Sequence, residues 1–134
     1  LASYRGRPVL VTFAYAHCET VCPIVVSDVM TAAARLPEIR PAVLIVTLDP
    51  WRDTPSRLAA MRAQWRLTGD ALVLSGAPEV VDRVLNAWRI PRVRNERTGD
   101  ISHPSLVYVI GADGRVTYVV TGGADVIAAA VRAL

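Results

Sequence analysis

The sequence predicts an α/β fold with a central mixed sheet flanked by helices on both faces. Three observations carry this prediction. Apolar runs of strand-forming residues alternate with helical segments three times in the first two thirds of the chain. Strands in that order pair in parallel through right-handed crossovers. Two later strands, joined by a glycine-containing turn, are expected to form a hairpin and to add antiparallel strands to the sheet.

The individual elements follow from local signals. We expect strands at 9–15, 42–48, 71–74, 105–110 and 116–120, and helices at 22–36, 55–67, 75–88 and 124–134. Pro23 suits a first helical turn, because the N–H that proline lacks would have no partner there. Asp53 or Thr54 is expected to cap the second helix, which starts at Pro55. This order of elements is the thioredoxin-like arrangement.

Length and composition fit one domain. The chain has 134 residues, 52% of them hydrophobic, which is enough for a single domain, 1–134, with a buried core. No apolar run approaches the roughly 20 residues of a membrane span, and the start shows no signal-peptide pattern. We therefore expect any N-terminal anchor or leader to lie outside this chain.

The charge of the protein comes from arginine. Its net charge of +3 reflects fifteen arginines, with no lysine, against twelve acids. The arginines are scattered and no nucleic-acid-binding motif accompanies them, so we expect no nucleic-acid partner. The segment 88–97, WRIPRVRNER, is the richest in arginine. It is interpreted either as a solvated loop or as a docking edge for an acidic partner.

Two cysteines, Cys18 and Cys22, lie where the first strand leads into the first helix. They are too few and too close in sequence to be a disulfide framework, which favours a redox or metal-binding role. A helix N-terminus favours the thiolate, the form that attacks disulfides and binds metals. We therefore expect two exposed, activated sulfurs at the carboxyl end of the first strand, where ligand sites of open α/β sheets tend to lie.

A metal would need a further ligand, and the chain has two histidines. His17 is expected to turn into the fold as a structural histidine, because neighbours on an extended segment point to opposite sides. His103 precedes the first hairpin strand, which this architecture places beside the N-terminus of the first helix, so it is expected near the thiols. Two thiolates and one imidazole favour Cu(I), while a catalytic zinc completed by an outside ligand stays open.

Three segments, FAYAHCETVCP, LDPWRDTP and SHPSLVYVIGADGRV, together resemble the Sco/SenC family of copper chaperones over nearly the whole chain. The resemblance implies a thioredoxin-like, extracytoplasmic protein, usually membrane-tethered by an N-terminal helix, that binds Cu(I) or Cu(II). Cys18, Cys22 and His103 fall on the family's ligand positions. The implied role is assembly of the dinuclear copper centre of cytochrome c oxidase, by transferring copper to the copper-receiving subunit, by reducing its cysteines, or both.

The chain departs from the family pattern in the cysteine loop. Family members often have Pro-Asp where this chain has Glu19 and Thr20, and we expect this to alter loop rigidity and copper affinity. Pro104 occupies a place similar to the cis-proline of thioredoxin-like oxidoreductases. The segment 102–105 is therefore expected to offer both a metal ligand and a backbone for docking a substrate, with a cis His103–Pro104 peptide as one option.

Whether the protein is an enzyme stays open. The alternative function is an extracytoplasmic thiol-disulfide oxidoreductase, in which the more exposed thiol, Cys18, attacks a partner disulfide and Cys22 resolves the mixed disulfide. A peroxidase is not favoured, because the loop lacks the Pro-x-x-x-Thr-x-x-Cys pattern of peroxiredoxins. Asp49 follows the second strand on the same sheet edge as Cys18, and is a candidate for orienting the site or a partner.

Overall fold

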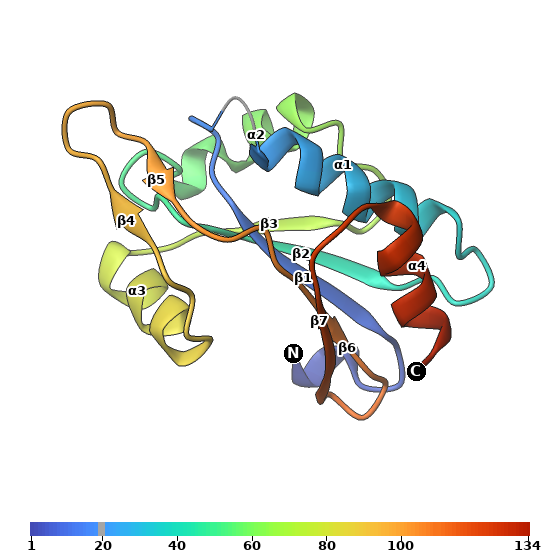
Figure 1. Ribbon diagram of the computed structural model, residues 1–134. Coiled ribbons are helices and arrows are strands. Elements are labelled where there is room, and N and C mark those ends of the chain that lie inside the picture. Colours follow the sequence, from blue (N-terminus) through green and yellow to red (C-terminus); the bar gives the residue numbers. More distant parts are fainter. Residues whose placement is uncertain (19–20) are drawn as a thin grey trace.

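A mixed sheet forms the centre of the protein, as predicted. The computed structural model describes residues 1–18 and 21–134, and within them the sheet has five strands in the order β3-β2-β1-β6-β7 (Figure 1). These strands are β1 (Val9–Ala14), β2 (Ala42–Thr47), β3 (Leu72–Leu74), β6 (Val107–Ile110) and β7 (Val116–Val120). The first three pair in parallel, whereas β6 is antiparallel to both β1 and β7.

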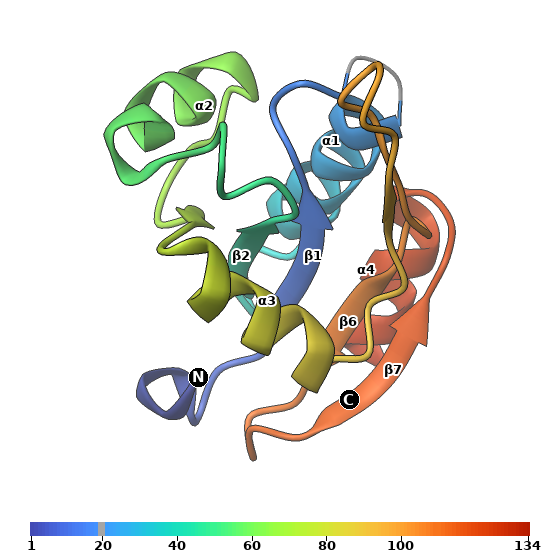
Figure 2. The same ribbon diagram turned by 90° about the vertical axis from the view of Figure 1, so that its left-hand side faces the viewer.

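Helices cover both faces of this sheet. They are α1 (Val21–Ala34), α2 (Leu58–Gln64), α3 (Pro78–Ala87) and α4 (Ala124–Arg132), with short 3-10 turns η1 (Ala2–Tyr4) and η2 (Pro55–Arg57). Helices α1 and α4 pack side by side on one face, while α3 crosses the other (Figure 2). In the part of the chain that the structure describes, no helix has the length and apolar character to cross a membrane.

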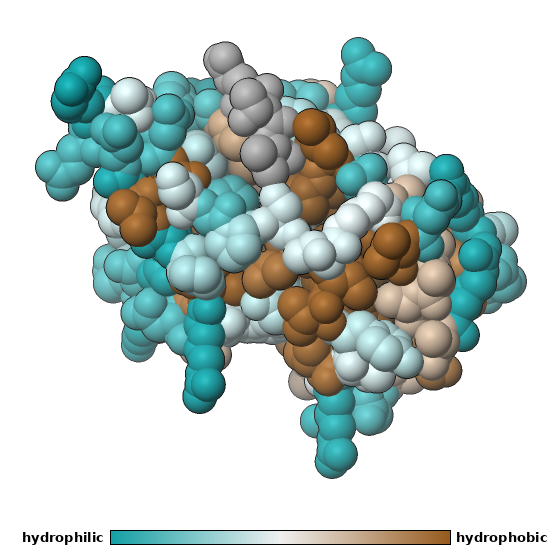
Figure 3. All heavy atoms as spheres, viewed as in Figure 1, coloured by the Kyte–Doolittle hydropathy of each residue, from teal (hydrophilic) through white to brown (hydrophobic). Residues whose placement is uncertain are grey.

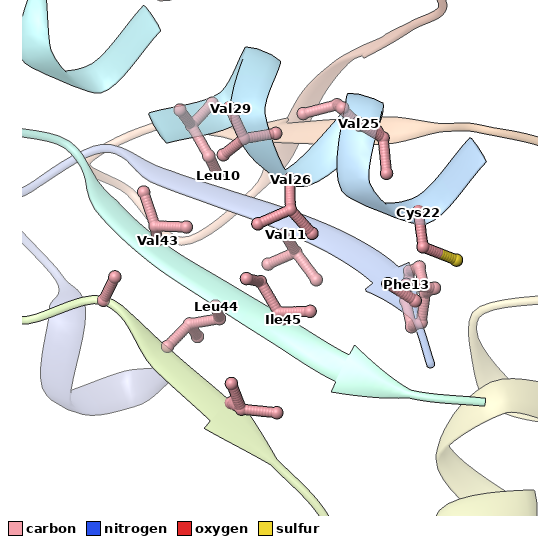
Figure 4. Close-up of a cluster of buried hydrophobic side chains, with 14 of the residues drawn as sticks. Leu10, Val11, Phe13, Cys22, Val25, Val26, Val29, Val43, Leu44 and Ile45 are labelled. Carbon is pink, nitrogen blue, oxygen red and sulfur yellow. The ribbon is translucent and has the colours of Figure 1, made fainter. Parts of the chain in front are cut away.

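The central strand β1 fixes the core, because all six of its residues are buried. On one face, Val26 and Val29 of α1 lie over the sheet (Figure 4). On the α3 side, the rings of Phe13, Trp88 and Tyr108 meet edge to face, with centroid separations of 5.8, 5.8 and 4.9 Å. Each such ring buries a large apolar area, so this cluster attaches α3 to the sheet.

A second hairpin lies outside the main sheet. Its strands, β4 (Val93–Arg94) and β5 (Ile101–Ser102), pair antiparallel and were not predicted, because two-residue strands leave no periodic signal. The hairpin lies at the end of the sheet where β1 leads towards α1 (Figure 1). Its outer side is mostly hydrophilic, whereas apolar side chains gather over β7 and α4 (Figure 3). The hairpin leads directly into His103.

The predicted side-chain cap of the second helix is wrong. Thr54 precedes η2 and makes no side-chain capping bond there. Asp53 is 2% exposed, and its Oδ2 accepts hydrogen bonds from the Thr47 hydroxyl at 2.8 Å and from the Ala16 N–H at 3.1 Å. A buried carboxylate needs donors, and these lie in β2 and in the loop before Cys18. Asp53 therefore holds the cysteine loop instead of a helix end.

The aromatic cluster generates a first prediction. Phe13→Ala should lower the free energy of unfolding by about 3–5 kcal/mol, because the neighbouring rings cannot collapse fully into the space that it leaves. Urea denaturation followed by tryptophan fluorescence measures this loss. Phe13→Leu, which keeps most of the side-chain volume, should cost clearly less, and a loss below 1 kcal/mol for the alanine variant would contradict the assigned packing.

An ion pair between loops gives a prediction on pH. Arg7 Nη1 lies 2.7 Å from Asp70 Oδ2, and this hydrogen bond lowers the pKa of the Asp70 carboxyl below its ordinary value. A carboxyl with a lowered folded-state pKa stabilises the protein above its unfolded pKa, about 3.9, and this contribution disappears as the pH falls through the folded value.

Asp70→Asn should therefore be less stable than the parent at pH 7, by about 0.2–1 kcal/mol because the pair is exposed, and this difference should shrink as the pH falls below the unfolded pKa of about 3.9. Urea unfolding at pH 7, 5 and 3 measures the difference. Asp28→Asn is the control, since Asp28 forms no ion pair among the described residues. A gap that stays constant over this range would exclude the proposed linkage.

Candidate dithiol and histidine site

The two cysteines are buried, contrary to the exposure predicted from their position. Cys18 is 8% exposed and Cys22 is 0% exposed, and both are thiols in this structure. Cys22 lies in the first turn of α1, on the side that packs against the end of β1, and this placement buries it. Cys18 is the more accessible of the two, as expected.

His103 lies beside Cys22, although 81 residues separate them. Its Nε2 is 3.6 Å from the Cys22 sulfur, and its Nδ1 is 3.0 Å from the carbonyl oxygen of Pro104. A carbonyl oxygen only accepts hydrogen bonds, so Nδ1 carries the proton and the lone pair of Nε2 faces Cys22. Burial lowers the pKa of His103 and keeps the ring neutral, the form that binds metals.

The prediction of an activated thiolate is wrong for Cys22. Burial raises its pKa far above the ordinary thiol value, and its hydrogen bond with Cys18 raises it further. Desolvation therefore outweighs the favourable field of the helix N-terminus, and Cys22 is a protonated thiol at neutral pH. The Cys22 N–H donates to the Cys18 sulfur at 3.3 Å, which holds that sulfur against the first turn of α1.

Tyr15 joins the cysteine loop to the hairpin that leads to His103. Its hydroxyl accepts from the Ile101 N–H at 2.8 Å and contacts the Ile101 carbonyl oxygen at 3.3 Å. Its ring meets the His103 ring edge to face, with centroids 6.0 Å apart. Burial raises the pKa of the hydroxyl, and its interaction with Cys18 adds to this. This role was not predicted from the sequence, although a tyrosine at the end of an apolar run needs a polar partner when it is buried.

A buried carboxylate ties the same hairpin to the loop after β2. Asp49 is 0% exposed and accepts hydrogen bonds from Arg52 Nε and, at 3.4 Å, from Arg94 Nη1. The Arg94 guanidinium also lies 5.0 Å from the centre of the Trp51 ring, and Arg52 donates to the Gly99 carbonyl. Asp49 therefore lies at the same edge of the sheet as Cys18, as proposed from the sequence. Its two partners, Arg52 and Arg94, hold the β4–β5 hairpin, called the His103 arm below because it leads into His103.

The structure brings Cys22 and His103 together, with Cys18 adjacent to Cys22. No group of three or more histidine, cysteine, aspartate and glutamate residues converges closely enough to hold a metal ion, within residues 1–18 and 21–134. The arrangement therefore contains a preformed sulfur and nitrogen pair with a second sulfur next to it.

One expectation around the site is wrong, and the option of a cis peptide is not realised. His17 is exposed instead of turned into the fold, and its Nε2 lies 3.9 Å from Asp100 Oδ1. It follows the last buried residues of β1 in a turn, so the strand alternation used to orient it no longer applies. The His103–Pro104 peptide is trans, as are all peptides in the described residues. The predicted effect of Glu19 and Thr20 lies outside the described residues.

The arginine-rich segment is partly built into the fold. Arg92 donates to the Ile90 carbonyl and to Asp82, and Arg94 is held by Asp49. Arg89 and Arg97 are exposed. The segment is therefore neither a plain solvated loop nor a continuous basic edge.

Together these features define a thioredoxin-like protein with a dithiol at the end of its first strand and a distant histidine facing one sulfur. The chain belongs to the SCO1/SenC family, whose model matches residues 1–134. The recognised segments around the two cysteines and His103 thus mark the right family.

Named relatives agree with this assignment. The human mitochondrial SCO1 homolog is 32% identical over 123 residues, which cover 83% of this chain. The chain spans between 39% and 63% of the length of such relatives. Bradyrhizobium japonicum ScoI with copper bound is 26% identical, with a TM-score of 0.74, over 98% of this chain and 87% of that one.

A third similarity is to BsSco, described as a member of the Sco family of cytochrome c oxidase assembly proteins with a disulfide switch. It is 25% identical, with a TM-score of 0.77, over 99% of this chain and 82% of that one. The fold is therefore that of the Sco proteins.

The hydroxyl of Tyr15 can be tested by removing it alone. Tyr15→Phe should lower the free energy of unfolding by about 1–3 kcal/mol, because the buried Ile101 N–H loses its acceptor. Amide hydrogen exchange at Ile101 should quicken more than exchange in β1. Tyr108→Phe is the matched control, since the Tyr108 hydroxyl forms no hydrogen bond within the described residues. Equal effects of the two variants would rule out the assigned role.

Proposed function

We propose that this protein binds one copper ion through Cys18, Cys22 and His103 and delivers it to another protein. The separation of 3.6 Å between the Cys22 sulfur and His103 Nε2 is the observation that carries the proposal. Bonds of about 2.3 Å to sulfur and about 2.0 Å to nitrogen, at about 120°, would leave these two atoms about 3.7 Å apart. The pair thus already has the spacing that a three-coordinate soft ion requires.

The chemistry of the three side chains supports copper as the cargo. Thiolates and a neutral imidazole suit Cu(I), which accepts three soft ligands. His103 is neutral and offers the lone pair of Nε2 towards Cys22, because Nδ1 donates to Pro104. Cys18 would have to approach this pair to complete the set, because the three side chains do not yet converge within the described residues. The relative from Bradyrhizobium japonicum with bound copper agrees with this choice of metal.

The proposed role is assembly of the dinuclear copper centre of cytochrome c oxidase. BsSco, which shares this fold, belongs to a family described as cytochrome c oxidase assembly proteins, which supports this role. Delivery would proceed by ligand exchange: the His103 segment opens, and cysteines of the receiving subunit replace the ligands of this chain one at a time. The proposal includes an extracytoplasmic location and a membrane tether in the full-length protein, both implied by the family resemblance.

A second candidate is the reduction of a partner disulfide. Two adjacent thiols, of which Cys18 is the more exposed, favour this alternative. The Cys18 thiolate would attack one sulfur of the partner disulfide and release the other as a thiol. Cys22 would then attack the Cys18 sulfur of the mixed disulfide, releasing the second partner thiol. The partner gains two electrons and two protons, and this chain ends with a Cys18–Cys22 disulfide that an external thiol must reduce.

A titration with Cu(I) separates the two functions. Reduced protein is titrated anaerobically against a competing Cu(I) chelator. His103→Ala and Cys22→Ser should each weaken copper binding at least about 100-fold, since even residues that only support metal ligands typically contribute 10–100-fold. The measurement is the chelator concentration that removes half of the copper.

His17→Ala is the matched control, because it removes the other histidine of the chain, which is exposed and one residue from Cys18. It should leave copper affinity unchanged. A parent protein that binds copper poorly, or a His103→Ala variant that binds it as well as the parent, would leave only the disulfide-reducing function.

A further inference from the structure

We propose that a hollow beside the cysteine loop binds a carboxylate side chain of the partner protein. This inference rests on the proposed function, because it assigns the kind of surface that the partner presents near Cys18. The hollow has a volume of about 430 Å³ and is lined by Ala16, His17, Arg52, Asp53, Arg57 and Gln64.

The hollow carries an arginine whose side chain has no polar partner in the part of the chain that the structure describes. Arg57 is exposed, and its side chain forms no hydrogen bond or ion pair within the described residues. Arg52, on the same wall, is held through Nε by Asp49 and through Nη2 by Gly99, which leaves Nη1 available. A guanidinium presents paired N–H groups that match a carboxylate, so these two side chains favour an acidic ligand.

Among the described lining residues, the single carboxylate is already bound within the fold. Asp53 is 2% exposed, and its Oδ2 accepts hydrogen bonds from Thr47 and Ala16. It therefore presents little negative charge to a ligand, while two arginines and the exposed His17 surround the opening. The lining residues that the structure describes include two arginines against one acid, and they lack the apolar character of a lipid or drug site.

The position of the hollow links it to the cysteines. Ala16 and His17 are the two residues before Cys18, and consecutive Cα atoms are about 3.8 Å apart, so the hollow begins within about 8 Å of Cys18. Gln64 Nε2 donates to the Ala16 carbonyl at 3.1 Å and fixes this wall. An extended partner segment rises about 3.3 Å per residue, so an acidic residue two or three positions from its cysteine would reach the hollow.

Docking of an acidic partner, which the sequence suggested for segment 88–97, is therefore assigned to the hollow. The side chains of Arg92 and Arg94 in that segment are bound within the fold, whereas that of Arg57 has no polar partner among residues 1–18 and 21–134. An acidic partner would therefore meet the Arg57 side chain at the end of η2, in the hollow that Ala16 and His17 also line.

Two synthetic peptides test the proposal without copper or thiol chemistry. Each peptide has ten residues, with a serine in place of the partner's cysteine. At the second and third positions from this serine, one peptide has glutamate and the other has glutamine. Chemical shifts of the parent protein are followed on titration at low salt. The glutamate peptide should bind about three- to fivefold more tightly, as expected for exposed charge pairs, and should shift the amides of Arg57 and Gln64.

Variants decide whether Arg57 is responsible. Arg57→Gln should abolish the preference for glutamate. Arg57→Glu should reverse the preference, so that this variant binds a third peptide, with lysine at the same two positions, more tightly than the glutamate peptide. Arg83→Gln is the matched control, because it removes one exposed arginine of α3 and lowers the net charge equally. Equal affinities for the glutamate and glutamine peptides, or the same loss in both glutamine variants, would overturn the proposal. The proposal would also be overturned if inorganic phosphate shifted the amides of Arg57 and Gln64 at a lower concentration than the glutamate peptide does.

The design separates this inference from the proposed function. Loss of copper binding in the titration above would not change the peptide result, because the peptides contain no thiol and the protein carries no metal. Conversely, a protein that binds copper but does not distinguish the two peptides would keep its proposed function and lose the docking site.

Discussion

The candidate site depends on one constraint: a histidine 81 residues beyond Cys22 must be held against that cysteine. The main sheet does not do this, since β6 begins only at Val107, after His103. The connection is made by the Tyr15 hydroxyl, which binds the Ile101 backbone two residues before His103. Tyr15 directly follows β1, the most buried strand of the sheet, so its position is fixed by the core. Its hydrogen bond to Ile101 in turn restricts the position of His103.

Buried carboxylates extend the same principle to the rest of the site. Asp53 holds the backbone of Ala16, just before the cysteines, and Asp49 holds Arg94 of the hairpin. A buried acid is costly unless donors surround it, so each of these residues forces two segments to stay together. Both follow β2 within a few residues. The segment LDPWRDTP therefore works as a junction between the cysteine loop and the His103 arm.

The sequence was sufficient for the main architecture and insufficient for the orientation of side chains around the site. Long apolar runs such as the one in β1 and the glycine turn between β6 and β7 report on strands directly, so the sheet was predictable. The hairpin of Val93–Arg94 with Ile101–Ser102 was not, since its stability comes from tertiary contacts of Tyr15 and Arg94. Propensity carries no information about such contacts.

The errors near the cysteines have a common physical origin. Position at a helix N-terminus predicted an accessible thiolate, but burial dominates at Cys22 and keeps it protonated. Strand alternation predicted a buried His17, but β1 ends at Ala14 and the following turn releases the side chain. In both cases the sequence pattern predicted the course of the backbone correctly. The burial of the side chain, which the pattern does not report, determined the protonation of Cys22 and the exposure of His17.

The way in which the histidine is held also determines how it can be released. Both residues of β4 are exposed, and the hairpin is attached by hydrogen bonds and ion pairs of Tyr15, Arg52 and Arg94, with only Ile101 buried. Segments with few buried apolar contacts open at a lower free energy than the global unfolding of a domain. The core strands and α1 would stay folded while the arm moves. This division fits the proposed delivery of copper, in which Cys22 would stay in the rigid part and His103 would move with the part that opens.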